Sequence, residues 1–287
     1  MTEVSLHAPR TREAATSNPD GRLAPRPRTA RRLRPGATSG RALAIGPLLL
    51  LLGWAGGSAV GLIDPATLSA PWSVVTTFGE LAADGRLQSN LLTSLQRSVA
   101  GLVLGVGAGV ALALLAGLTR TGEALIDGPV QVKRAVPTLA LIPLAIIWFG
   151  IGEQMKIIMI AASVLIPVYV NTHAALRGVD ARYVELAETV GLSRLRFVRQ
   201  VALPGALPGF FVGLRLAVTV SWTALVVVEQ VNATSGIGYL MTQARTYGQT
   251  EIIIAGLVVY AVFGLVGDTA VRAVERSALS WRRTLGS

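Results

Sequence analysis

Six apolar runs limit the folds open to this chain more than any other feature of its sequence. A helix needs roughly 20 apolar residues to cross a bilayer, and a backbone inside lipid must satisfy its own hydrogen bonds. The sequence therefore predicts an all-α integral membrane protein with six transmembrane helices. The expected spans are residues 42–63, 91–118, 136–151, 156–172, 206–229 and 251–271.

The basic residues gather between these spans. Residues 1–41 contain nine arginines, and the connections 119–135 and 173–205 and the C-terminal end carry most of the others. Cytoplasmic loops of membrane proteins are rich in Lys and Arg, so we expect these segments and both termini in the cytoplasm. The distribution accounts for the net charge of +10 without nucleic-acid binding, which we do not expect.

Composition divides the chain into three parts. Residues 1–41 have few large apolar side chains and are predicted to form a disordered basic tail. Residues 42–272 are expected to form the transmembrane domain, and residues 273–287 a second cytoplasmic tail. The pair Arg31-Arg32 also resembles a twin-arginine export signal, which would make the first span a cleaved segment. The further spans that follow it favour a retained first helix.

Two of the expected spans, 136–151 and 156–172, are short. Each would give roughly 24 Å of helix, against a hydrocarbon core of about 30 Å. Each also contains a proline, Pro143 and Pro167. Two interpretations remain open: these are short helices buried among the others, or they line a pathway, as broken helices do in transporters.

Residues 180–204 are polar and segmented, in contrast to the spans on either side. Asp180 is a candidate N-cap, and Gly191 can adopt the left-handed conformation that ends a helix. An apolar stripe with helical spacing lies between them: Tyr183, Leu186, Ala187 and Val190. A second helix is expected to begin after Ser193 and to end at Pro204. The segment is therefore predicted to be a cytoplasmic hairpin of two short amphipathic helices.

Such a hairpin could have three roles. It could rest on the membrane surface with its arginines at the headgroups, or serve only as a basic connection. It could also insert its apolar stripe into a groove on a partner. The two glutamates, Glu185 and Glu188, and the hinge at Gly191 favour the partner, because neither of the other roles needs them.

The spacing in this hairpin resembles a known signature. Glu185-Leu186-Ala187 is followed after three residues by Gly191, after nine more by Val201, and after one more by Leu203-Pro204. This is similar to the EAA motif of the membrane subunits of bacterial ABC importers. Leu186 stands where the motif has alanine and Val201 where it has isoleucine.

Within that class the chain is most similar to the nitrate/sulfonate/taurine permease family. The stretches that carry this resemblance are VPTLALIPLAIIWFGIG (136–152), LPGALPGFFVGLRLAVTVSWTALVVVE (203–229) and SGIGYL (235–240). The resemblance implies uptake of a small solute, such as an aliphatic sulfonate, taurine, nitrate or a similar anion. A permease of the same family for a non-anionic solute, such as a vitamin precursor, is the alternative.

The resemblance also implies an assembly in the bacterial inner (plasma) membrane. A multi-pass permease of this kind pairs with a second copy and with two cytoplasmic ATPase subunits, which bind ATP and Mg. An extracytoplasmic binding protein delivers the solute. The ATPase would contact the hairpin, and movement of the hairpin would switch the pathway. The residues expected to couple to the ATPase are Tyr183, Glu185, Leu186, Ala187, Glu188, Gly191, Leu195 and Pro204.

The residues of this chain give it no evident chemistry of its own. Its only lysines, Lys133 and Lys156, do not follow a glycine, so it has no P-loop. It has no cysteine and two histidines, so we expect no metal site and no bound cofactor. A membrane enzyme is therefore disfavoured. An ion-coupled secondary transporter would call for internal repeats and a central carboxylate network, neither of which the sequence indicates.

Ionisable and aromatic residues inside the spans are candidates for the pathway, because an exposed charge in lipid is costly. Those we expect to line it are Arg97, Pro143, Trp148, Trp222 and Glu229. Asp268, in contrast, can pair with Arg272 one helical turn away, and Arg215 is expected to pair or to reach the membrane surface.

Overall fold

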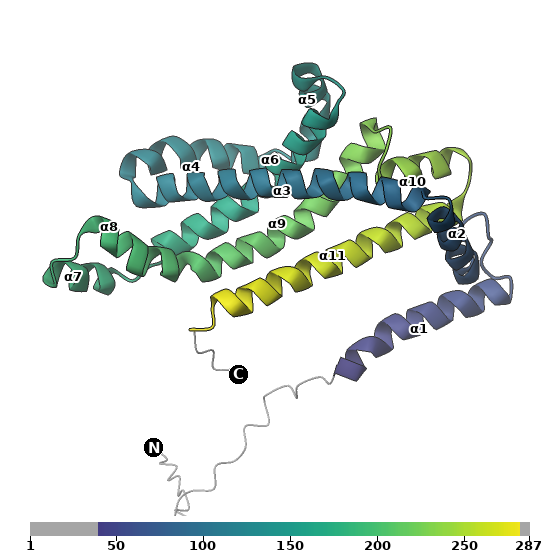
Figure 1. The fold of residues 1–287 in the computed structure, drawn as a ribbon, viewed down its shortest axis with the longest axis horizontal. Coiled ribbons are helices and arrows are strands. Elements are labelled where there is room, and N and C mark those ends of the chain that lie inside the picture. The colour runs from purple at the N-terminus through teal and green to yellow at the C-terminus, as the bar shows by residue number, and fades with distance from the viewer. Residues whose placement is uncertain (1–39, 282–287) are drawn as a thin grey trace, which may run out of the picture. The chain divides into compact units, whose positions relative to one another are not determined.

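The computed structural model describes residues 40–281, with the side chains of residues 40–44 and Asn232 left aside. This part of the chain is helical and contains no strand, which confirms the all-α prediction (Figure 1). The α-helices are α1 (Gly40–Ala59), α2 (Pro71–Ala83), α3 (Arg86–Leu118), α4 (Arg120–Ala135), α5 (Ile142–Phe149), α6 (Glu153–Arg177), α7 (Ala181–Thr189), α8 (Arg194–Phe197), α9 (Leu203–Asn232), α10 (Ile237–Thr246) and α11 (Thr250–Ala278). A 3-10 helix, η1 (Thr138–Leu141), and a π turn, η2 (Val198–Ala202), complete them.

The chain forms two units that meet within α1, one ending at Leu49 and one beginning at Leu50. The helices from α2 onward belong to the second unit, and the arrangement below concerns that unit alone. Residues 1–39 and 282–287, which hold most of the two predicted tails, lie outside the described residues.

The expected six spans are not confirmed. Four helical segments in the described part are long and apolar enough to cross a membrane: α3, α6, α11 and the continuous stretch Arg194–Val231. A fifth span results if α4 and the segment Thr138–Phe149 are counted together, although they are bent by 89°. The apolar part of α1, Ile45–Ala59, is shorter than these.

Helix α6 lies at the centre of the unit and packs along both α3 and α9. Glycines make this close packing possible, because small residues let helix backbones approach each other. A Cβ atom at Gly105 of α3 would lie 2.6 Å from the carbonyl oxygen of Ala161, and one at Gly213 of α9 would lie 2.8 Å from that of Pro167. The two neighbouring helices therefore contact α6 through backbone as well as through side chains.

The span expected at 156–172 is present as α6, but its predicted shortness is wrong, because α6 runs for 25 residues and is long enough to cross. Polar residues at its two ends, which ended the apolar run in the sequence, continue the helix. Pro167 lies inside it without ending it, and the side chain of Asn171 donates to the Pro167 carbonyl oxygen at 2.8 Å. Of the two short spans, only the one containing Pro143 is broken.

The segment 119–135, which the basic residues suggested was a connection between spans, forms the helix α4 after Thr119. Thr119 caps α4 by accepting a hydrogen bond from the backbone N–H of Gly122 at 3.0 Å. The helix then folds back along α3, and its Val130 is buried with residues of α3 and α6. Its last turn, with Lys133 and Arg134, therefore reaches the middle of α6.

The chain turns sharply after α4. Val136 is extended (φ −92°, ψ 120°), as expected for a residue before a proline, and Pro137 has no N–H with which to continue the helix. The predicted span 136–151 thus becomes η1 and α5. Pro143 lies in the first turn of α5, where a proline is tolerated, so it does not interrupt a helix.

We expect Gly105→Ala to destabilise the protein by about 1–3 kcal/mol, the usual effect of overpacking. The added methyl group would meet the backbone of α6, which cannot move aside like a side chain. Gly107→Ala is the matched control, because a Cβ atom at Gly107 has no neighbour within 4 Å. Thermal unfolding in detergent measures both. Equal unfolding midpoints for the two variants would contradict this account of the packing.

Candidate functional site

The first half of the predicted hairpin is present as α7 and the turn that follows it. Asp180 caps α7 by accepting a hydrogen bond from the N–H of Arg182 at 2.9 Å. The helix ends in a Schellman motif: the N–H of Leu192 donates to Ala187 at 2.8 Å, and that of Gly191 to Glu188 at 3.1 Å. Gly191 has φ +67°, the left-handed conformation predicted for it.

The second half differs from the prediction, because Pro204 does not end a helix. Helix α8 continues through the π turn η2 into α9, so that Arg194–Val231 forms one stretch of 38 residues. Pro204 lies in the first turn of α9, and the widened π turn just before it accommodates a residue that cannot donate a helical hydrogen bond. Ser193 occupies the N-cap position of α8, but its side chain makes no capping bond.

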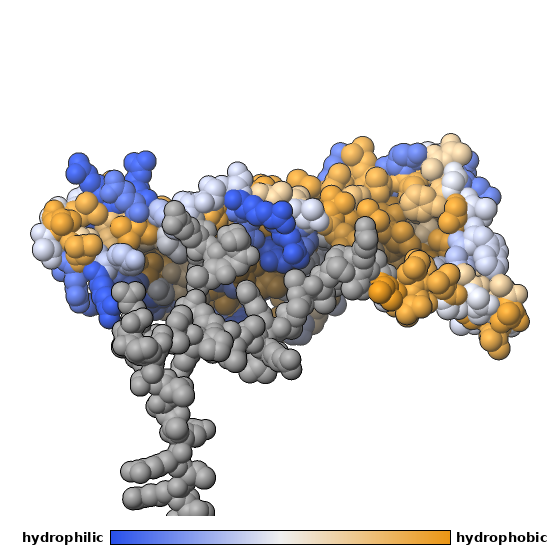
Figure 2. All heavy atoms as spheres, turned by 90° about the horizontal axis from the view of Figure 1, so that it is seen from below, coloured by the Kyte–Doolittle hydropathy of each residue, from blue (hydrophilic) through white to orange (hydrophobic). Residues whose placement is uncertain are grey.

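The hairpin exposes an apolar surface. Its exposed apolar residues, between 40% and 70% accessible, are Tyr183, Val184, Leu186, Val190 and Leu195. Ala187 alone of the predicted stripe is buried, which fixes the side of α7 that faces the protein. Glu185 and Glu188 are also exposed. In Figure 2, apolar residues (orange) lie among hydrophilic ones (blue) at the end that carries α7 and α8.

One contact attaches the hairpin to a long helix, and a second joins two helices beside it. Arg194, the first residue of α8, donates to the carbonyl oxygen of Leu118, the last residue of α3, at 2.6 Å. This bond satisfies one of the carbonyl groups left free at a helix C-terminus. Arg177 and Glu123 form an ion pair of 3.0 Å between the end of α6 and the start of α4. The hairpin is thus joined to α3 by a hydrogen bond and to α9 by continuous helix.

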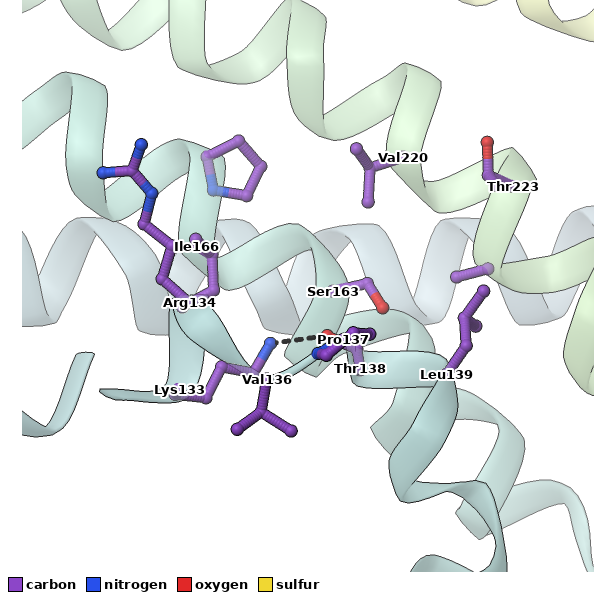
Figure 3. A pocket seen from close by; sticks show the side chains of 12 residues that line it. Lys133, Arg134, Val136, Pro137, Thr138, Leu139, Ser163, Ile166, Val220 and Thr223 are labelled. Carbon is purple, nitrogen blue, oxygen red and sulfur yellow. Dashed lines mark hydrogen bonds between the residues drawn. The ribbon is translucent and has the colours of Figure 1, made fainter. Parts of the chain in front are cut away.

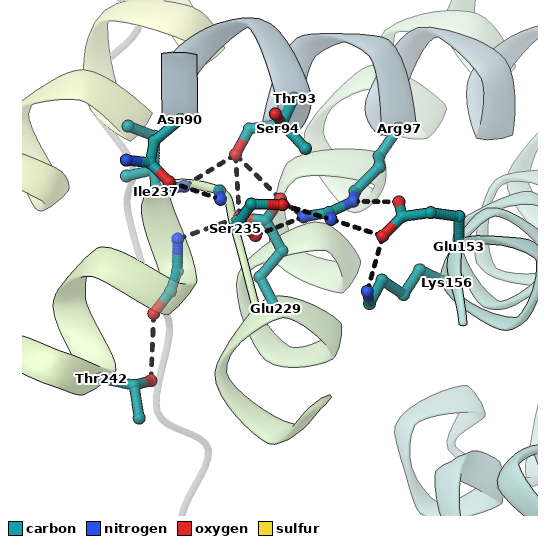
Figure 4. Close-up of polar contacts among 12 residues, drawn as sticks. Asn90, Thr93, Ser94, Arg97, Glu153, Lys156, Glu229, Ser235, Ile237 and Thr242 are labelled. Carbon is teal, nitrogen blue, oxygen red and sulfur yellow. Dashed lines mark hydrogen bonds and ion pairs between the residues drawn. The ribbon is translucent and has the colours of Figure 1, made fainter. Parts of the chain in front are cut away.

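A buried polar cluster lies toward the other end of the same helices (Figure 4). Arg97 of α3 is 2% exposed and uses all five N–H donors of its guanidinium. Its Nε and Nη2 bind the two carboxylate oxygens of Glu153 at 2.5 and 2.6 Å. Its Nη1 binds Glu229 at 2.7 Å and the carbonyl oxygen of Ser235 at 2.6 Å, and Nη2 also reaches the Ser235 hydroxyl at 3.1 Å.

Glu229 of α9 is the acidic centre of this cluster and is 1% exposed. It accepts hydrogen bonds from the Ser94 hydroxyl at 2.8 Å, the Gly238 N–H at 2.9 Å and the Tyr260 hydroxyl at 3.1 Å. Lys156 adds a second cation, 2.8 Å from Glu153. Arg97, Lys156 and Glu229 are buried, whereas Glu153 is exposed. The two cations are paired with the two carboxylates, as buried charges require, and the cluster joins α3, α6, α9, α10 and α11.

The structure brings only part of the expected pathway together. Arg97 and Glu229 are in contact, whereas Pro143 and Trp148 lie on α5, where Trp148 is 66% exposed. Trp222 stacks on Phe263 with ring centroids 4.9 Å apart. Nothing in the sequence pointed to Ser94 or Tyr260, because residues of these types are common on helix faces.

The other intramembrane charges behave as expected. Asp268 pairs with Arg272 at 2.7 Å and with Arg215 at 3.1 Å.

Comparison with known proteins identifies the class to which this arrangement belongs. Residues 101–280, which include the hairpin, match the model of the family described as binding-protein-dependent transport system inner membrane component. The chain belongs to this family. Membership confirms what the spacing of the EAA-like motif predicts. The matched region also contains Glu153 and Glu229, and Arg97 lies just before it.

Three relatives within the permeases are similar over most of the chain. The putative aliphatic sulfonates transport permease protein SsuC of Bacillus subtilis is 37% identical over 83% of this chain and 86% of its own length. SsuC of Escherichia coli is 41% identical over 82% and 89%. The taurine transport system permease protein TauC of Escherichia coli is 33% identical over 83% and 89%.

A solved structure supports the permease fold. The structure described as that of an amino acid ABC transporter with histidines has a TM-score of 0.58 and 18% sequence identity, and it covers 69% of this chain and 97% of its own. At this identity the likeness concerns the fold.

Proposed function

We propose that this chain is the transmembrane permease subunit of an ABC importer for a small organic anion, an aliphatic sulfonate or taurine. The observation that carries the proposal is the exposed apolar face of α7 and α8 within an EAA-like motif. The names of the SsuC and TauC relatives support sulfonates and taurine over nitrate and over a non-anionic solute.

The proposed complex contains a second copy of this chain and two cytoplasmic ATPase subunits, which hold the ATP and Mg. An extracytoplasmic binding protein completes it, in keeping with the description of the family. The chain itself contributes no ATPase site. Both of its termini would face the cytoplasm, its transmembrane domain would cover residues 42–272, and the complex would lie in the bacterial inner membrane.

The hairpin would transmit movement of the ATPase to the spans. Because α8 continues into α9 without a break, a displacement at Leu195 would carry α9 with it. The bond from Arg194 to Leu118 would pull α3 in the same direction. The Schellman turn at Gly191 would keep α7 and α8 at a fixed angle, so that the hairpin moves as one piece.

The pathway would close at the end opposite the hairpin. There the Arg97–Glu229–Glu153 contacts join α3, α9 and α6, and their separation would let these helices part. On the cytoplasmic side of this closure, the pathway would be lined by Pro143 and Trp148 of α5 and by Trp222 of α9.

We expect Leu186→Glu to reduce co-purification of the ATPase subunits by about tenfold or more, because a charge would enter an apolar contact. Leu186 is more than half exposed, so the variant should still fold and insert. Leu186→Ala is the matched control; it restores the residue usual in the EAA motif and should retain the ATPase. Full co-purification by the Leu186→Glu variant would rule out this face as the docking surface.

A further inference from the structure

The break between α4 and η1 opens a cavity of about 370 Å³ (Figure 3). Its walls come from the last turn of α4, from η1 and from the middle of α6 and α9. Lys133, Arg134, Thr138, Ser163 and Thr223 give it a polar side. Apolar residues form the rest, among them Leu139, Ile166 and Val220.

Lys133 brings a positive charge to this cavity that no carboxylate of the described residues balances. Its Nζ donates to the Thr138 hydroxyl at 2.7 Å and to the carbonyl oxygen of Ala162 at 2.5 Å, both of which are neutral. Within the described part of the chain, neither Lys133 nor Arg134 forms an ion pair. The other lysine, Lys156, is in contrast paired with Glu153.

The position of the cavity, beside the middle of two helices that are membrane-span candidates, makes this charge unusual. Ala162 lies near the middle of α6, and Thr223 lies well inside α9, and both helices are membrane-span candidates. A lysine at such a position is rare, and it marks a substrate or ion pathway more often than a structural contact. Broken helices in transporters line such sites at the middle of the membrane.

We propose that this cavity binds the anionic headgroup of the transported solute, with Lys133 as its main counter-charge and Arg134 beside it. The Thr138 hydroxyl accepts a hydrogen bond from Lys133, which leaves its own proton free to donate to a sulfonate oxygen. The apolar wall suits a short aliphatic chain. The inference rests on the proposed function, and it places the anion at Lys133 and not at Arg97, the other buried cation expected along the pathway, whose donors are all used.

Uptake by the complete complex tests this assignment. Proteoliposomes that contain the chain, its ATPase subunits and its binding protein are loaded with ATP and supplied with radiolabelled ethanesulfonate. Lys133→Met should raise the KM for ethanesulfonate uptake by about tenfold or more, as expected for loss of a charge-assisted contact. Lys133→Arg keeps the positive charge, so its KM should lie close to that of the wild type. Arg120→Met, at the exposed start of the same helix, is the control and should transport normally.

A thiol introduced at this position gives a second test that does not depend on the stability of Lys133→Met. The chain has no cysteine, so Lys133→Cys introduces the only one in this subunit. Modification with methanethiosulfonate ethylammonium returns a positive charge and should restore uptake, whereas the ethylsulfonate reagent should not. Saturating ethanesulfonate should slow both modifications.

The outcomes separate this inference from the proposed function. If the wild-type complex takes up ethanesulfonate but Lys133→Met has the wild-type KM, the cavity is not the anion site. Modification of the Lys133→Cys variant at the same rate with and without ethanesulfonate leads to the same conclusion. If the wild-type complex transports no sulfonate, the proposed function itself fails.

Discussion

Replacing Glu229 with methionine should destabilise the protein by about 3–5 kcal/mol, the usual effect of leaving one partner of a buried ion pair without the other. Arg97 would keep Glu153 but lose the carboxylate on its other side, in a site where it is 2% exposed. The Ser94 and Tyr260 hydroxyls and the Gly238 N–H would lose their acceptor as well. The thermal unfolding midpoint of the detergent-purified protein should fall sharply.

The double variant Arg97→Met/Glu229→Met is the informative comparison. It removes both buried charges and leaves Glu153 with Lys156, so the charge balance of the cluster is kept. Apolar replacement of a whole buried pair is often close to neutral, so the double variant should recover the part of the loss that comes from the unpaired charge of Arg97. Asp268→Asn, at a more exposed pair, should shift the midpoint little. If the single and double variants have the same unfolding midpoint, the cluster does not hold the helices as described.

The second large effect is expected at the hairpin turn. Gly191→Val should reduce ATP-driven uptake by about tenfold or more, because a side chain at φ +67° costs roughly 1–2 kcal/mol even before β-branching is counted. A Cβ atom at this position has no neighbour within 4 Å, so the effect would come from the backbone alone. The variant should still insert and purify, because the long helices do not depend on this turn.

Gly191→Asn is the matched control, since asparagine tolerates the left-handed conformation. It should keep most of the uptake, whereas Gly191→Val should still hydrolyse ATP in the complex without coupling it to transport. Wild-type uptake by Gly191→Val would show that the angle between α7 and α8 has no part in coupling.

The sequence was sufficient for features that depend on local chemistry. The Asp180 cap, the left-handed Gly191 and the helical nature of the spans follow from residue type and spacing, and each is present in the structure. The family followed from the resemblance of the same segment to the EAA motif, and the match over residues 101–280 confirms it.

The helix bounds predicted from the sequence were wrong where the position of a polar residue depends on residues far from it in the chain. Lys133 and Arg134 suggested a loop, yet they end a helix whose break is set by Pro137. Glu153 was expected outside a span and Lys156 at the first position of one, but both lie in the first turn of α6, where Arg97, 56 residues from Glu153, pairs with it. A hydropathy profile detects neither a helix break set by a proline nor a charge neutralised by a distant partner, because it is calculated from each residue without its neighbours in space.

The most direct measurement of the central claim is accumulation of ethanesulfonate by proteoliposomes that contain this chain, its ATPase subunits and the binding protein. The account predicts accumulation that requires hydrolysable ATP and every one of these components, and that is lost with a non-hydrolysable analogue. Accumulation driven by an ion gradient in liposomes that contain this chain without the ATPase subunits would contradict it.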